Sequence, residues 1–129
     1  MNVLAVTDTT QMRWDAEADV VVVSFGGAGA CAAIEAADNG ASVLAIDRID
    51  GGGATEASGG VYYGGGTRFQ REAGFDDNAE EMYKYLDMEL AGVVAPKTLR
   101  RFCESSNANL EWLIDKGLTY GSRFSADKT

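Results

Sequence analysis

The sequence of 129 residues contains no histidine, one proline and two cysteines, and 20 acidic residues outnumber 11 basic ones. Without histidine it has neither a Ser-His or Cys-His catalytic pair nor a histidine metal ligand. Cys31 and Cys103 match no metal-binding spacing, so we expect no metal site, reduced thiols and a cytoplasmic location. The net charge of −9 repels nucleic acid and anionic membrane surfaces, which excludes both as expected partners.

Long hydrophobic runs are also missing. Hydrophobic residues make up 46% of the chain, enough for a globular core, but no apolar run approaches the length that crosses a bilayer. The first residues lack the basic and apolar regions of a secretory signal. We interpret residues 1–18, which are mixed and polar, as a surface lead-in, and the length allows at most one modest domain.

Glycine, by contrast, is abundant, and it falls in two clusters. The first cluster follows four consecutive valines, a pattern that predicts a strand over residues 20–24 of the kind buried on both faces. An alanine-rich stretch predicts a helix from near Ala28 to Ala37, ended by Asn39-Gly40. Residues 42–47 predict a second short strand. Together these segments predict a βαβ unit with adjacent parallel strands.

The first cluster has the form of a dinucleotide-binding turn, G-x-G-x-x-G. Gly26 and Gly29 occupy its second and third glycine positions, and Ala33 the small packing position that follows. Ser24 stands where the first glycine is usual, and its side chain is expected to crowd the turn. Asp47 ends the second strand about twenty positions after Gly26, the offset at which an acid accepts hydrogen bonds from a ribose hydroxyl. The alternative is a solvated strand-end carboxylate.

The second cluster favours FAD over a nicotinamide cofactor. A nicotinamide-binding domain typically passes from its second strand into another helix, whereas residues 51–67 supply bare backbone amides, small hydroxyls and two tyrosines. Arg48 raises the alternative of NADP, but the neighbouring Asp47 would repel a 2′-phosphate. A flexible linker is the other alternative for this loop. Tyr62 and Tyr63 could stack near a flavin or donate protons, although we prefer packing roles for both.

Further helices are predicted after the loop. Asp76, Asp77 and Asn78 offer N-caps for a helix through about Leu90. Pro96 suits the first turn of another helix. Ser105 or Ser106 is expected to start a separate helical piece that Gly117 closes.

With these residues in hand, residues 19–67 resemble the FAD domain of the fumarate reductase and 3-oxosteroid dehydrogenase flavoproteins. The similarity lies in the segment from Val20 to Gly29, in Ile46-Asp47-Arg48 and in the segment from Ser58 to Thr67. The last segment, with Leu110-Glu-Trp-Leu113, is most similar to the steroid branch, which includes Δ4-(5α)-dehydrogenases.

The resemblance implies an α/β fold, an incomplete Rossmann-like βαβ FAD-binding unit followed by helices. Residues 19–129 would be the N-terminal part of an FAD-binding domain, with the other strands supplied by remaining chain or a complementary subunit. The implied activity is a flavin-dependent oxidoreduction of a C–C bond next to a carbonyl, in a small 3-oxosteroid or fumarate-type substrate. Its catalytic residues are unknown and expected outside this segment, which alone would be inactive. An inactive truncated or split remnant and a nicotinamide-dependent oxidoreductase stay open as alternatives.

The residues assigned to the cofactor lie in the two glycine clusters and at the end of the second strand. The resemblance places the first cluster at the pyrophosphate, the acid and base after the second strand at the adenosine end, and the second cluster along the pyrophosphate and flavin. The expected FAD-binding set is Ser24, Gly26, Gly27, Ala28, Gly29, Asp47, Arg48, Gly53, Ala54, Thr55, Ser58, Gly59 and Gly60.

Overall fold

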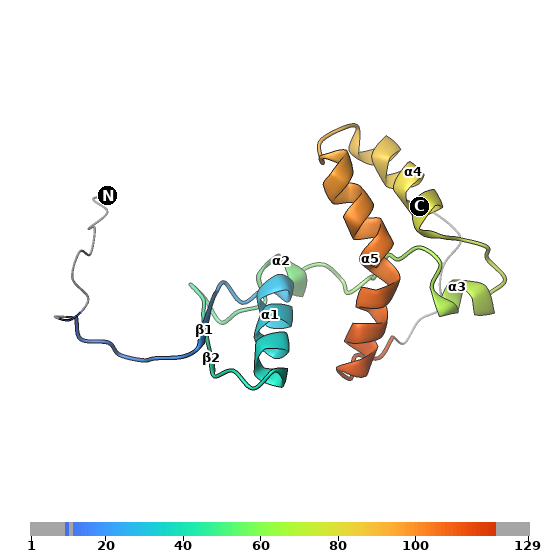
Figure 1. Ribbon diagram of the computed structural model, residues 1–129. Helices are drawn as coiled ribbons and strands as arrows, with labels where there is room; N and C mark the ends of the chain where they lie inside the picture. Colours follow the sequence, from blue (N-terminus) through green and yellow to red (C-terminus); the bar gives the residue numbers. More distant parts are fainter. Residues whose placement is uncertain (1–9, 11, 121–129) are drawn as a thin grey trace. The chain divides into compact units, whose positions relative to one another are not determined.

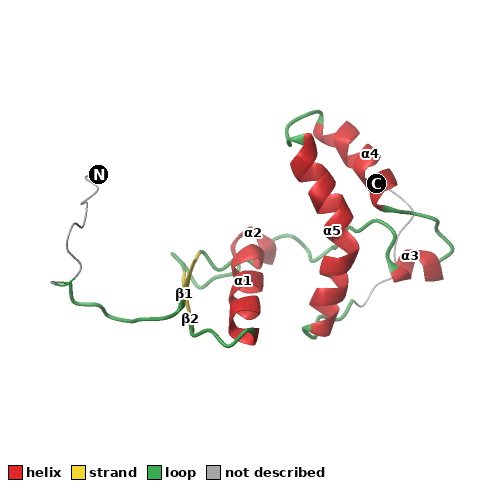
Figure 2. Cartoon of the chain, in the orientation of Figure 1, coloured by secondary structure: helices red, strands yellow, loops and turns green. Residues whose placement is uncertain are grey.

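The computed structural model describes residue 10 and residues 12–120, so most of the interpreted lead-in at residues 1–18 lies outside the described part. The chain divides into two compact units, residues 1–61 and 62–129. The first unit contains the two strands, and the second is helical (Figure 2). No helix among the described residues is long and apolar enough to cross a membrane.

The first unit is the predicted βαβ crossover. Strand β1 (Val20–Val23) pairs in parallel with β2 (Val43–Ile46), and Val20 and Val23 lie opposite Val43 and Ile46. Helix α1 (Gly27–Asp38) packs beside both strands (Figure 1). Asn39 is its C-cap, and the following Gly40 has a φ of +84°, a left-handed conformation that favours glycine.

In the described part of the chain, one face of the sheet is covered by α1 and the other is exposed. Val22 is buried, whereas its neighbours Val21 and Val23 are 51% and 75% exposed. Successive side chains of a strand point to opposite faces, and α1 is the described helix that packs extensively against the strands. The expectation that the first strand is buried on both faces is therefore not met within the described residues.

The second unit packs α4 (Ala79–Leu90) against α5 (Pro96–Asp115). Met82, Leu99 and Cys103 form its buried core. The Asn78 side chain caps α4 by accepting hydrogen bonds from the backbone N–H groups of its first turn, and a proline occupies the first turn of α5. Both helix starts agree with the sequence prediction.

The predicted break at Ser105 or Ser106 is wrong, because α5 continues through both residues. The Ser106 hydroxyl donates to the Cys103 carbonyl oxygen 2.8 Å away, inside the helix, and does not cap a new helix. Its oxygen also accepts the Gly65 N–H at 3.2 Å. By local sequence alone, Ser106 favours a helix start. In the structure its hydroxyl oxygen is instead bound by a segment about forty residues earlier.

Two short helices were not predicted. Helix α2 (Gly53–Glu56) lies inside residues 51–67, which we expected to form a loop. Helix α3 (Arg68–Glu72) follows that loop. Thr67 and Gln70 form a capping box at the start of α3, each side chain binding the other residue's backbone N–H. That Thr-x-x-Gln spacing was visible in the sequence.

Candidate cofactor site

The two glycine clusters meet in space. Gly26 and Gly52 form a parallel bridge outside the strands, and the Gly52 N–H donates to the Phe25 carbonyl oxygen at 2.9 Å. A Cβ added to Gly53 would lie 3.4 Å from the Gly26 Cα, so backbone packs directly against backbone. The pairing of β1 with β2 thus continues past both strand ends and brings the turns together.

Helix α1 begins at this junction. Its N-cap residue, Gly26, has no side chain that could accept a capping bond, and its first turn carries no acid. The Gly27 N–H donates to Thr55 Oγ1 at 3.0 Å, and the first intrahelical bond runs from Ala30 N–H to the Gly26 carbonyl oxygen. A helix leaves its first N–H groups without intrahelical partners, and the macrodipole makes this end positive. Backbone N–H groups and a positive end together suit a pyrophosphate.

Gly29 allows the helix to cross closely over β1. A Cβ at this position would lie 2.1 Å from the Ser24 carbonyl oxygen, a distance that no side chain tolerates. At Gly26 the added Cβ would meet its nearest atom, the Gly52 carbonyl oxygen, at 3.6 Å, an ordinary contact. Gly29 is therefore required for packing, whereas the structure would accept a Cβ at Gly26.

Ser24 adopts the conformation of the glycine that it replaces. Its φ is +79°, and Ala91 is the one other non-glycine residue with a positive φ in the described part of the chain. The left-handed region is unfavourable for a residue with a Cβ. The turn geometry of the glycine pattern is thus kept at some conformational cost.

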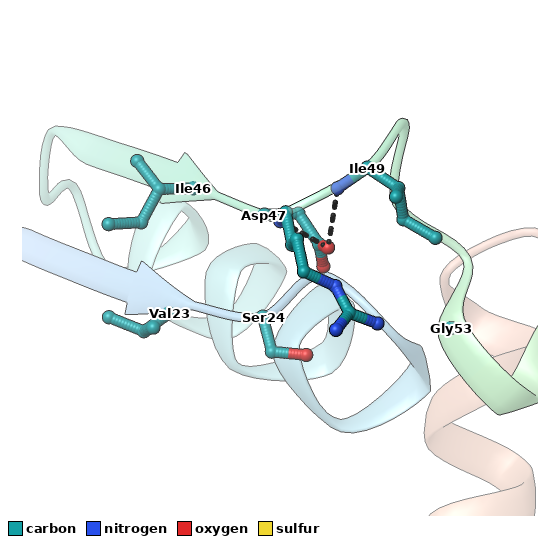
Figure 3. A pocket seen from close by; sticks show the side chains of 7 residues that line it. Val23, Ser24, Ile46, Asp47, Ile49 and Gly53 are labelled. Carbon is teal, nitrogen blue, oxygen red and sulfur yellow. Dashed lines mark hydrogen bonds between the residues drawn. The ribbon is translucent and has the colours of Figure 1, made fainter. Parts of the chain in front are cut away.

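Asp47 and Arg48 border a hollow of about 410 Å³ at the carboxyl ends of the strands (Figure 3). The hollow is lined by Val23, Ser24, Ile46, Asp47, Arg48, Ile49 and Gly53. The Asp47 carboxylate accepts the backbone N–H groups of Phe25, Arg48 and Ile49. These bonds, that from Phe25 foremost, lower the pKa of Asp47 below its ordinary value of 3.8, so at neutral pH the group is an anion.

The rest of the second cluster extends away from the turn. Ala54 and Thr55 lie in α2. The Ser58 hydroxyl donates to the Thr55 carbonyl oxygen at 2.7 Å and accepts the Gly60 N–H at 3.4 Å. Gly59 and Gly60 have φ values of +74° and +73°, and nothing lies within 4 Å of a Cβ added to either.

The structure therefore gathers most of the predicted residues at one place, around the start of α1 and the end of β2. Ser58, Gly59 and Gly60 follow α2 and do not join the turn contacts given above. Sequence reasoning missed Phe25 and Gly52, whose backbone groups connect the two turns. The sequence signal for Gly52 was the run Gly51-Gly52-Gly53. In the structure all three of these glycines adopt a positive φ.

Tyr62 and Tyr63 both pack within the second unit. The Tyr62 hydroxyl donates to the Ser106 carbonyl oxygen at 2.7 Å, and its ring meets Tyr120 edge to face. The Tyr63 ring meets Tyr85 in the same way. Burial raises the pKa of both tyrosines, which agrees with the packing roles that we preferred. Among the described residues no cluster of acids and cysteines could hold a metal ion.

The residues present fit a dinucleotide. Two glycine turns meet at the start of α1, where the N-cap Gly26 carries no side chain, and an ionised acid stands at the end of the neighbouring strand. These features define a dinucleotide-binding α/β protein.

The family is shown by comparison with known proteins. Residues 19–128 match the family described as "FAD binding domain", and the chain belongs to it. The sequence resemblance and the choice of FAD over a nicotinamide cofactor are thereby confirmed.

Individual relatives are steroid dehydrogenases and fumarate reductase-like flavoproteins. The 3-oxo-5-alpha-steroid 4-dehydrogenase of Comamonas testosteroni is 46% identical over 98% of this chain and 24% of its own length. The NADH:fumarate oxidoreductase of Klebsiella pneumoniae is 43% identical over 78% of this chain and 11% of its own length. The chain thus spans about a quarter or less of the length of these relatives.

A solved structure agrees with the fold. The crystal structure of 3-ketosteroid-delta4-(5alpha)-dehydrogenase from Rhodococcus jostii RHA1, in complex with 4-androstene-3,17-dione, superposes with a TM-score of 0.77. The two chains are 44% identical, and the match covers 87% of this chain and 24% of the Rhodococcus chain. The α/β FAD-binding fold predicted from the sequence is confirmed.

Proposed function

We propose that this chain holds the FAD of an oxidoreductase that adds or removes two hydrogens across a C–C bond next to a carbonyl. When bound, FAD supplies the redox chemistry, and the protein supplies binding, orientation and electrostatics. The observation that carries the proposal is the junction of two glycine turns at the N-terminus of α1, where the N-cap Gly26 has no side chain.

The proposed contacts follow from that junction. The pyrophosphate would lie over Gly26 and accept the N–H groups of Ala28 and Gly29, because these belong to the first turn of the helix. Asp47 and Arg48 would face the adenosine end. The other proposed cofactor residues are Ser24, Gly27, Gly53, Ala54, Thr55, Ser58, Gly59 and Gly60.

For the substrate class, a 3-oxosteroid is favoured over a fumarate-type acid. The 46% identical relative and the 44% identical solved structure, which cover 98% and 87% of this chain, are both named as steroid dehydrogenases. We assign no catalytic residue here and place the groups that handle substrate and protons outside residues 19–129. We also propose a cytoplasmic location, which the free thiols of Cys31 and Cys103 support.

A second candidate is a protein that binds FAD without turnover. Ser24 favours it, because a side chain at φ +79° strains the turn that must receive the cofactor. Affinity and turnover, measured on the same preparation, separate the two candidates.

The test is a titration of the purified protein with FAD, NAD and NADP, followed by calorimetry and flavin fluorescence quenching. We expect FAD to bind more tightly than either nicotinamide nucleotide, and the reverse order would refute the assignment. The enzyme containing this chain is then assayed with a 3-oxosteroid and an artificial electron acceptor. FAD binding without oxidation or reduction of a 3-oxosteroid or of fumarate would favour the second candidate.

A further inference from the structure

Asp47 binds the protein's own backbone on both sides. Its Oδ2 accepts the Phe25 N–H, which belongs to the turn after β1. Its Oδ1 accepts the N–H groups of Arg48 at 2.6 Å and Ile49 at 3.2 Å, which follow β2. One carboxylate therefore connects the ends of both strands.

These bonds leave little acceptor capacity for a ribose. An ionised carboxylate offers about four lone-pair positions, and three backbone N–H groups already take one each. The two neighbouring hydroxyls of a ribose would need two more. A role limited to ribose binding therefore does not account for the arrangement of Asp47.

The bond to Phe25 acts on the strained part of the turn. The Phe25 N–H belongs to the peptide that follows Ser24, so its direction depends on the backbone conformation of Ser24. The Phe25 carbonyl oxygen accepts the Gly52 N–H at 2.9 Å. Both backbone polar groups of Phe25 are thus held by the segment that follows β2, immediately beside the residue with φ +79°.

We propose that Asp47 is a positioning residue, which holds the Ser24 turn in its cofactor-binding conformation before FAD arrives. Its effect on cofactor affinity rests on the proposed function, whereas its effect on the turn does not. An asparagine at this position could not take over the role, because an amide offers one oxygen. The amide NH2 group is itself a donor. Depending on its orientation, it would face either the Phe25 N–H or the N–H groups of Arg48 and Ile49, with which it cannot form hydrogen bonds.

The experiment measures hydrogen exchange, by mass spectrometry, of the segment 20–30 in the full-length protein freed of FAD. Asp47→Asn should speed exchange there by about tenfold, the scale of one lost hydrogen bond to a charged group, and should weaken FAD binding. Asp50→Asn removes a charge three positions away and should change neither quantity. Asp47→Glu keeps the carboxylate and should retain part of the protection.

Repeating the measurement in a Ser24→Gly protein makes the test specific to positioning. In the Ser24→Gly protein, Asp47→Asn should have a smaller effect on exchange and on affinity, because glycine adopts positive φ without restraint. Equal effects in both backgrounds would overturn the proposal. Unchanged exchange with weaker FAD binding would also overturn it and leave Asp47 as a ribose ligand only. Faster exchange in a protein that binds no FAD would instead support the positioning role and refute the proposed function.

Discussion

Replacing Ser24 by glycine relieves strain at the centre of the proposed cofactor site. A left-handed conformation costs a residue with a Cβ roughly 1–2 kcal/mol, and Ser24 has a φ of +79°. Glycine loses roughly 0.5–1 kcal/mol more conformational entropy on folding. We therefore expect Ser24→Gly to raise the free energy of unfolding by about 1 kcal/mol, seen as a higher melting temperature of the FAD-free protein.

The effect of Ser24→Gly on the cofactor depends on the free turn. If the turn relaxes without FAD, glycine should tighten binding several-fold, as about 1 kcal/mol corresponds to a factor of about five. If Asp47 holds the turn in both states, affinity should stay unchanged. Ala91→Gly is the matched control, because Ala91 has a φ of +45° at the end of α4. It should stabilise the protein without altering FAD affinity. Weaker FAD binding by Ser24→Gly would refute the strain argument and assign the serine hydroxyl a contact.

Two further substitutions test the packing of the first unit. Gly29→Ala should unfold it, because the new Cβ would lie 2.1 Å from the Ser24 carbonyl oxygen; melting like that of the wild type would contradict this. Hydrogen bonds from Ser42, chiefly that of its hydroxyl, lower the pKa of Asp19 below 3.8. The ionised Asp19 therefore contributes stability above pH 3.8, and this contribution is lost as the pH falls through the lowered pKa. Asp19→Asn should therefore remove part of the acid sensitivity seen in urea unfolding below that pH, and an unchanged pH profile would speak against the Ser42 contact.

The βαβ unit was predictable because its signals are local. Four valines, a glycine turn and Asn39-Gly40 determine where β1 and α1 begin and end, and the structure places them within one residue of the prediction. The exposure of Val23 was not predictable in this way, since it depends on which elements cover the sheet.

Interactions between distant segments lay outside the reach of the sequence analysis. In α5 the Ser106 hydroxyl accepts the Gly65 N–H, a contact from another part of the chain that local sequence does not reveal. The offset from Gly26 singled out Asp47 as a ribose ligand. Its bond to Phe25 appears only when β1 pairs with β2. The capping box of Thr67 and Gln70 was, by contrast, a local signal that we overlooked.

The central claim is that FAD lies against the bare backbone of Gly26, and Gly26→Ala tests it most directly. The structure accepts this methyl group, whose nearest neighbour would be 3.6 Å away, so the variant should fold and melt nearly as the wild type does. The methyl group would occupy the space proposed for the pyrophosphate and should weaken FAD binding at least tenfold in a calorimetric titration. Gly40→Ala, at φ +84° and remote from the turn, should lower stability and leave affinity unchanged. A folded Gly26→Ala protein that binds FAD as tightly as the wild type would contradict the account.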